Sequence, residues 1–484
     1  MHIVDLIIFI LYILIMLGIG FFFHKRNKDI DDYYVGGRKM GSLHIGLSVV
    51  ATDVGGGFSI GLGGLGFAIG LSGSWMLFTG LIGAWMSAVI LIPRVKKLSE
   101  NVKLFTFPQI FETFYNNKVA LLAGIISAIG YIGFTSSQLL AGAKLASATF
   151  MNLNMNNALL LMGAVAIIYT VLGGLKAVIY TDSVQWAILM TGLIFIGIPF
   201  SYNAIGGMDA IRATLGPEFL QFNNLSWQDF TNWFVTIVPI WFVGMTLYQR
   251  IYATRNVKEA KKAWYIAGLF EWPIMAFMGV LLGLFARVAF ENGMFLDMGY
   301  ESRDALDAEM GLPLLLRNIL PFGLMGLILS AYFSAILSTA DSCLMAASGN
   351  VLSDILGRTK KFKLESKRTL LFSKMLTFII GGIALLIAMK MTMVLELMLS
   401  SYAVMVSGLF IPVLFAILSR KTNSVAAFLA MFMGGGTTIS LIFLESRLPF
   451  GLDANIFGIS ISLVVYLLSD QIFKKYRKLK TYGA

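Results

Sequence analysis

The sequence predicts an all-α polytopic membrane protein with about thirteen transmembrane helices. Of its 484 residues, 57% are hydrophobic and only 13% are charged. The apolar residues gather in segments of about 20 residues, the length that crosses a bilayer. The Lys and Arg residues between these segments concentrate on one side of the predicted membrane. This distribution accounts for the net charge of +11 and excludes a soluble protein and a nucleic-acid-binding protein.

The predicted spans follow one another along nearly the whole chain. They are residues 3–23, 43–70, 74–93, 119–150, 157–174, 181–204, 231–249, 263–289, 321–347, 370–389, 393–418, 424–444 and 454–473. The first is too long for a signal-peptide core, so we interpret it as a retained helix. We predict a single transmembrane transporter domain over residues 1–484, with no appended soluble domain.

The basic residues predict the orientation of these helices. With the N-terminus outside, 30 of the 37 Lys and Arg residues belong to cytoplasmic segments, if Lys374 near the end of its span is counted with the adjacent loop. The external ones are Arg212, Arg303, Arg317, Lys390 and Arg447, and Lys144 and Arg287 lie within or at the ends of spans. The positive-inside rule therefore predicts an external N-terminus and a cytoplasmic C-terminus. We interpret the location as a cell membrane, specifically a bacterial inner membrane.

Two further charged features are interpreted as side chains exposed to water. The external segment 290–320 contains an acidic group, which we interpret as a solvated loop surface. Its members are Asp297, Glu301, Asp304, Asp307 and Glu309. The only cation of span 119–150 is Lys144, which we expect to extend toward the outer surface.

The most informative segment is residues 335–342, Ala-Ile-Leu-Ser-Thr-Ala-Asp-Ser, inside a predicted span. Hydroxyl and carboxylate groups are costly in hydrocarbon, so at membrane depth they indicate a functional site. Ala335, Ser338, Thr339 and Ser342 are spaced so that they share one helix face. A carbonyl at 335 with hydroxyls at 338 and 339 favours a small hard cation. The alternative is that each hydroxyl bonds only to a carbonyl of its own helix.

The second span contains an unusual number of glycines. Asp53 is followed by Val54 and by glycines at 55, 56 and 57, with further glycines at 61, 63, 64, 66 and 70. Glycine weakens a helix by about 1 kcal/mol per site relative to alanine. Irregular backbone survives at membrane depth only where it is buried in protein or lines a cavity. We therefore predict a broken helix at residues 55–57, with Asp53, Gly55 and Gly56 supporting the break, and close packing at the later glycines.

The topology also allows internal symmetry. If spans two to six form one five-helix unit, over residues 43–204, and spans seven to eleven form another, over residues 231–418, the odd number of helices makes the two units inverted. The first span and the last two, residues 424–473, flank them. No sequence similarity between the halves supports this arrangement.

Several segments resemble the sodium/solute symporter family, which includes sodium-coupled glucose, proline and sialic acid carriers. Residues 51–56 (ATDVGG) resemble the broken second helix of that family, and residues 173–185 (GGLKAVIYTDSVQ) resemble its signature between spans five and six. Gln249-Arg250, with Ala253 and the run 258–261, resembles the loop after span seven. The segment 335–342 resembles the ion-binding helix. The motifs occur in order across nearly the whole chain.

The resemblance implies a LeuT-type fold of two inverted five-helix repeats and a sodium site between spans two and nine. The implied sodium ligands are the carbonyls of Ala51, Val54 and Ala335 and the hydroxyls of Ser338 and Thr339. A second sodium or proton site is implied at Asp182, Ser338, Asp341 and Ser342. The implied substrate pocket lies at mid-membrane, where the candidates are Trp75, Phe78, Gln138, Trp241, Met245 and Glu271. Each candidate alone is also compatible with ordinary packing.

We therefore predict a sodium-coupled symporter that imports a small polar organic solute by alternating access. The solute belongs to the sugar, amino acid, carboxylate or vitamin class, and Na⁺ is the coupling ion. No catalytic or nucleotide-binding pattern points to an enzyme, and no nucleic acid or obligate protein partner is expected. Two alternatives stay open: a proton-coupled symporter, with Asp341 or Asp182 carrying the proton, and a membrane sensor that binds its solute without moving it.

Overall fold

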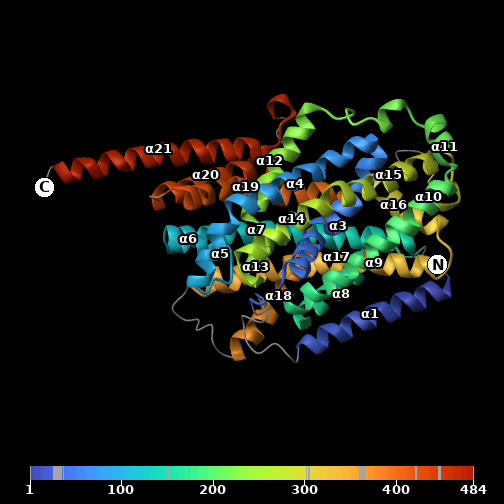
Figure 1. Ribbon diagram of the computed structural model, residues 1–484, viewed down its shortest axis with the longest axis horizontal. Coiled ribbons are helices and arrows are strands. Elements are labelled where there is room, and N and C mark those ends of the chain that lie inside the picture. The colour runs from blue at the N-terminus through green and yellow to red at the C-terminus, as the bar shows by residue number, and fades with distance from the viewer. Residues whose placement is uncertain are drawn as a thin grey trace.

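The computed structural model describes residues 2–24, 35, 38–150, 153–173, 175–300, 302, 306–358, 367–419, 422–444 and 448–482. This part of the chain is helical and contains no strand, only an isolated bridge between Met40 and Thr254. Gly174, Glu301, Arg303, Asp304 and Arg447 of the predictions above lie outside the described residues. Figure 1 shows a bundle in which the helices run roughly along one common direction.

The helices of the first half begin with α1 (Ile3–His24), α3 (Ser42–Ile69) and α4 (Trp75–Ile90). They continue with α5 (Ile92–Asn101), α6 (Pro108–Phe114), α7 (Asn117–Thr149), α8 (Met155–Gly173), α9 (Leu175–Gly192), η2 (Leu193–Gly197), α10 (Ile198–Ala204) and α11 (Gly207–Thr214). Short turns of helix, η1 (Gly70–Ser74) and η3 (Pro217–Leu220), complete this half.

The second half begins with α12 (Trp227–Val243), α13 (Met245–Ala253), α14 (Val257–Leu269), η4 (Phe270–Met275) and α15 (Ala276–Glu291). It continues with η5 (Leu296–Met298), α16 (Ala308–Ile319), α17 (Leu324–Gly349), η7 (Asn350–Leu356), α18 (Lys367–Ala388), α19 (Val394–Leu418), α20 (Ser424–Phe443), η8 (Pro449–Gly451) and α21 (Ala454–Tyr482). Each of the thirteen predicted spans coincides with one helix or with a helix interrupted by a short irregular turn.

Nine stretches of the described chain are long and apolar enough to cross a membrane, or ten when the bent pair α12 and α13 counts as one span. The count is lower than thirteen because Gly55–Ile90 is counted as one stretch, and because the apolar parts of α1 and α8 are short, at Ile3–Ile15 and Met155–Val171. The domain boundaries expected from the sequence therefore stay predictions.

The most enclosed helix is the one that carries the polar segment 335–342. Of the 18-residue apolar segment within Leu324–Leu356, 94% is buried, whereas in Ala454–Lys474 only 17% of the corresponding segment is buried. α17 packs against α3, α7 and α9 at the centre, and α1 lies along the outside of the bundle (Figure 1). α20 and α21 pack together at the opposite edge, where α21 extends beyond the other helices. The polar residues of α17 therefore face protein and not lipid.

The helices are interrupted where the sequence weakens them. In α3, Gly55 takes φ +33° and ψ −157°, which divides the helix as predicted from its glycines. Gly244 separates α12 from α13, which meet at 42°. Trp272 in η4 is also non-helical, with φ −136° and ψ 125°. Irregular backbone inside the membrane marks positions that hold ligands or line cavities.

An ion-pair network joins α7 to the beginnings of α16 and α19, and it corrects two expectations. Lys144 of α7 does not extend to the outer surface but donates to Asp307 and, at 2.6 Å, to Glu309. Glu309 is only 1% exposed, so it is not part of a solvated loop surface. Its carboxylate accepts the amides of Val394 and Leu395 at 2.8 and 2.9 Å, at the start of α19. The buried amides and the ammonium group together satisfy the Glu309 carboxylate.

Candidate functional site

The broken helix α3 meets α17 through neutral oxygen atoms. The Thr339 hydroxyl donates to the Ala51 carbonyl oxygen at 2.9 Å and lies 3.3 Å from the Ala335 carbonyl oxygen. The Ser338 hydroxyl lies 3.3 Å from the same Ala335 oxygen. All four residues are buried, with exposed fractions between 0 and 7%. Hydroxyl and carbonyl oxygens gathered without a charge are ligands that Na⁺ accepts.

The helix break redirects two backbone amides. In a continuous helix the amides of Gly56 and Gly57 would bond to the carbonyls of Thr52 and Asp53. Here the amides of Gly56 and Gly57 donate instead to the side-chain oxygen of Gln138 on α7, at 2.7 and 3.3 Å. The backbone of Val54 lies directly before the break, and its side chain is outside the described residues. Gln138, predicted as a substrate ligand, thus stabilises the break.

Gly55 is required at its position for two reasons. Its positive φ favours glycine. A Cβ atom there would lie 2.5 Å from the Thr339 hydroxyl oxygen. The missing side chain therefore lets the break approach α17 closely enough for the Thr339–Ala51 contact.

A second polar cluster lies beside these residues and is organised by Arg250 of α13. Its side chain donates to the Ser48 and Ser342 hydroxyls at 3.0 Å, to the Thr246 carbonyl at 3.2 Å and to the Thr52 hydroxyl. It also pairs with Asp182 at 3.3 Å.

The Asp182 carboxylate accepts the Ser48 hydroxyl at 2.6 Å as well. Asp182 is fully buried. The pair lies between α3, α9, α13 and α17, and it balances one buried charge with another.

Asp341 lies on the face of α17 that meets α8. The Thr170 hydroxyl of α8 donates to one of its oxygens, and the other accepts no protein hydrogen bond. Asp341 is fully buried and forms no ion pair within the described chain. Ser342, its neighbour, is bonded to Arg250. The structure therefore brings together only part of the predicted second site. Asp182 and Ser342 both contact Arg250, whereas Asp341 faces α8.

The Asp53 carboxyl group does not support the helix break directly. It lies within hydrogen-bonding reach of the Glu271 carboxyl group in η4, and the two are 6% and 0% exposed. The amides that follow the break bond to Gln138, as described above. The break thus places an acidic side chain against a second acidic side chain from another helix.

The remaining substrate candidates separate into different places. Trp75 donates to the Phe222 carbonyl at 2.8 Å, beside the loop after η3, and packs edge-on against Phe78. Phe78 also packs edge-on against Trp272 of η4, the residue after Glu271. Met245 accepts the Phe107 amide at 3.0 Å, next to α6. Trp241, which is fully buried, lies against Gly83 of α4, the helix that Glu271 contacts at Gly80.

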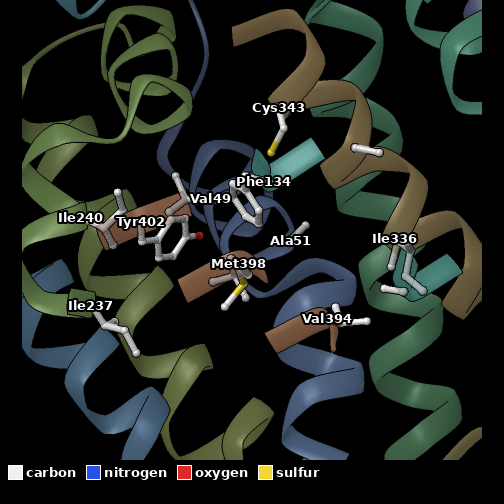
Figure 2. Close-up of a cluster of buried hydrophobic side chains, with 14 of the residues drawn as sticks. Val49, Ala51, Phe134, Ile237, Ile240, Ile336, Cys343, Val394, Met398 and Tyr402 are labelled. Atoms are coloured by element: carbon white, nitrogen blue, oxygen red, sulfur yellow. The ribbon is translucent and has the colours of Figure 1, made fainter. Parts of the chain in front are cut away.

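Aromatic side chains that the sequence reasoning missed surround the Asp53 region. Figure 2 shows Tyr402 and Phe134 together near Val49 and Ala51, and their rings meet edge-on at 4.9 Å. Arg250 was also missed as a site residue, because it was counted as a loop cation. The signal that could have found it is the buried Asp182, which needs a partner.

The comparisons with known proteins cover nearly the whole chain. The family model described as the Sodium:solute symporter family matches residues 33–434. The chain belongs to this family. The symporter is 26% identical to an osmoregulated proline transporter of Bacillus subtilis, over 97% of its own chain and 94% of the relative. It is also 26% identical to a sodium/proline symporter of Escherichia coli, over 90% and 87% of the two chains.

The solved structures agree on the fold. A Na⁺-coupled sialic acid symporter superposes on 97% of this chain and 98% of its own, with a TM-score of 0.79 and 22% identity. The predicted LeuT-type fold is confirmed. Family membership makes the protein a multi-pass membrane transporter that couples Na⁺ to the movement of a small organic solute, and not an enzyme.

Proposed function

We propose that the symporter holds its coupling sodium ion at the junction of α3 and α17, with five ligands. These are the carbonyl oxygens of Ala51, Val54 and Ala335 and the hydroxyl oxygens of Ser338 and Thr339. The observation that carries this proposal is the Thr339–Ala51 contact across the helix break, 2.9 Å long and fully buried. Sodium bound here would tie the broken helix to α17, so that ion and solute each raise the affinity of the other.

We propose the orientation with the N-terminus outside and the C-terminus in the cytoplasm, supported by the excess of Lys and Arg in the segments it makes cytoplasmic. The inward sodium gradient and the membrane potential, about 2.3 kcal/mol per charge per 100 mV, then drive import. The relatives named above transport proline, which supports a small polar solute.

The sodium site is tested by removing one ligand. We expect Thr339→Ala to raise the sodium concentration for half-maximal uptake several-fold or more, because a hydroxyl ligand is lost. Thr339→Ser should retain nearly normal sodium dependence. The measurement is uptake into proteoliposomes at varied external sodium. Thr377→Ala is the matched control, because that buried hydroxyl bonds only to the Ser373 carbonyl of its own helix. An unchanged sodium dependence in Thr339→Ala would remove Thr339 from the site.

The second ion site is tested at Asp341. If Asp341 binds an ion, Asp341→Asn should change the number of sodium ions moved per solute, measured from the reversal potential of proteoliposomes. Asp354→Asn is the control, because Asp354 is equally buried and also accepts a threonine hydroxyl, from Thr106 at 2.9 Å, although it pairs with Arg358 at 3.7 Å as well. An unaltered ion ratio in Asp341→Asn would make Asp341 a structural residue.

A further inference from the structure

Asp53 and Glu271 form an acidic pair that the sodium site does not use. The two carboxyl groups come from α3 and η4 and lie within hydrogen-bonding reach of each other. Asp53 Oδ2 and both Glu271 oxygens accept no hydrogen bond from a donor group of the described protein. Carboxylate oxygens that are nine-tenths buried normally have donors, so these oxygens are suited to donors on a ligand.

The pair also has no positive partner in the described part of the chain. Neither carboxyl group forms an ion pair with a Lys or Arg side chain of the described chain. The buried cations Arg250 and Lys144 pair instead with Asp182 and with Glu309. Two carboxyl groups in contact inside a protein repel each other when both are ionised, unless they share a proton or meet a positive group. A positively charged group of a ligand would therefore be stabilised by this pair.

The surroundings of the pair favour an organic cation. Glu271 lies over Gly80 of α4, where a Cβ atom would be 2.2 Å from its Oε2. Trp241 lies over Gly83, one helical turn along the same face, and its indole N–H has no hydrogen-bond partner although the ring is fully buried. Tyr402 lies near Val49 and Ala51, on the α3 segment that leads to Asp53 (Figure 2). Carboxylates beside aromatic rings are the groups that bind ammonium, through hydrogen bonds and cation–π attraction.

We propose that Asp53 and Glu271 together bind the protonated amine of the transported solute. This inference rests on the proposed function and names the chemical class of its solute, a small amine or amino acid. Asp53 precedes the Gly55 break by two residues, so a cation held here would contact the same broken helix as the proposed sodium ion. Coupling between ion and solute would then pass through a few residues of α3.

The first test is a sodium-driven uptake screen with the full-length protein in proteoliposomes. The probes are the twenty amino acids, ethanolamine and putrescine, against glucose, lactate and pantothenate, which lack an amine. We expect every transported compound to carry a protonated amine. A transported solute without an amine would overturn the inference and leave the sodium proposal standing. The sodium proposal is tested separately by thermal stabilisation with sodium alone.

The second test is Glu271→Gln with the amine found in the screen. We expect its KM to rise at least about tenfold, because a buried charge pair is broken. The sodium concentration for half-maximal stabilisation should be unchanged. Glu396→Gln, at an exposed glutamate of α19, is the control. An unchanged KM, or a changed number of sodium ions per solute, would overturn the inference.

A third variant covers the case in which Glu271→Gln does not fold. Gly80→Ala keeps both acids but places a methyl group where the Glu271 carboxylate lies. It should raise the KM for the amine and spare sodium binding, whereas an unchanged KM for the amine would contradict the inference. Glu271→Asp, which keeps the charge, should recover part of the affinity.

Discussion

Replacing Gly55 with alanine is expected to reduce sodium-driven uptake at least tenfold. The backbone at Gly55 has a positive φ, which costs an L-residue about 1–2 kcal/mol. The added methyl group would also lie 2.5 Å from the Thr339 hydroxyl, so one of the two must move. Either movement separates Thr339 from the Ala51 carbonyl and removes two proposed sodium ligands from their shared position.

The measurement for Gly55→Ala is sodium-dependent thermal stabilisation together with uptake. Gly436→Ala is the matched control, because a Cβ atom at Gly436 of α20 would meet nothing within 4 Å. Elution of the variant as a single symmetrical peak in detergent would show that it still folds. Normal sodium affinity in a folded Gly55→Ala variant would disprove the link between the break and the sodium site.

The junction of α3 and α17 could be predicted from the sequence because its residues interrupt long apolar segments. Hydroxyls at Ser338 and Thr339, and glycines beside Asp53, are costly inside a membrane unless they are buried in protein or bind a ligand. Helical spacing then showed which of them share a face. The structure places Thr339 against Ala51, which is the relation that the resemblance implied.

The partners of the buried charges could not be predicted in the same way. Helical spacing gives neighbours within one helix and says nothing about which helices meet. Glu271 was considered as one polar residue among many, although it meets Asp53. Lys144 and Glu309 were assigned to the surface because charged residues near span ends usually lie there. Each of these contacts joins segments far apart in the chain, so only the tertiary structure reveals them.

The largest effect on stability is expected from Arg250→Gln. Arg250 is fully buried and donates to groups on α3, α9, α13 and α17, so its loss leaves Asp182 as an unpaired charge inside the protein. Removing one partner of a buried pair costs about 3–5 kcal/mol. Uptake should be lost, and the thermal midpoint of the purified protein should fall by several degrees. Arg94→Gln is the control, because Arg94 is exposed and donates only to the Ile90 carbonyl of its own turn.

A double variant separates the charge from the hydrogen bonds. If the unpaired Asp182 causes the instability, Arg250→Gln combined with Asp182→Asn should be more stable than Arg250→Gln alone, because no buried charge remains. Additive losses would show instead that Arg250 acts mainly by bridging Ser48, Thr246 and Ser342. In both cases sodium-driven uptake should stay low. The arginine joins α3 and α17 next to the proposed sodium ligands, and a neutral pair cannot bridge all four helices.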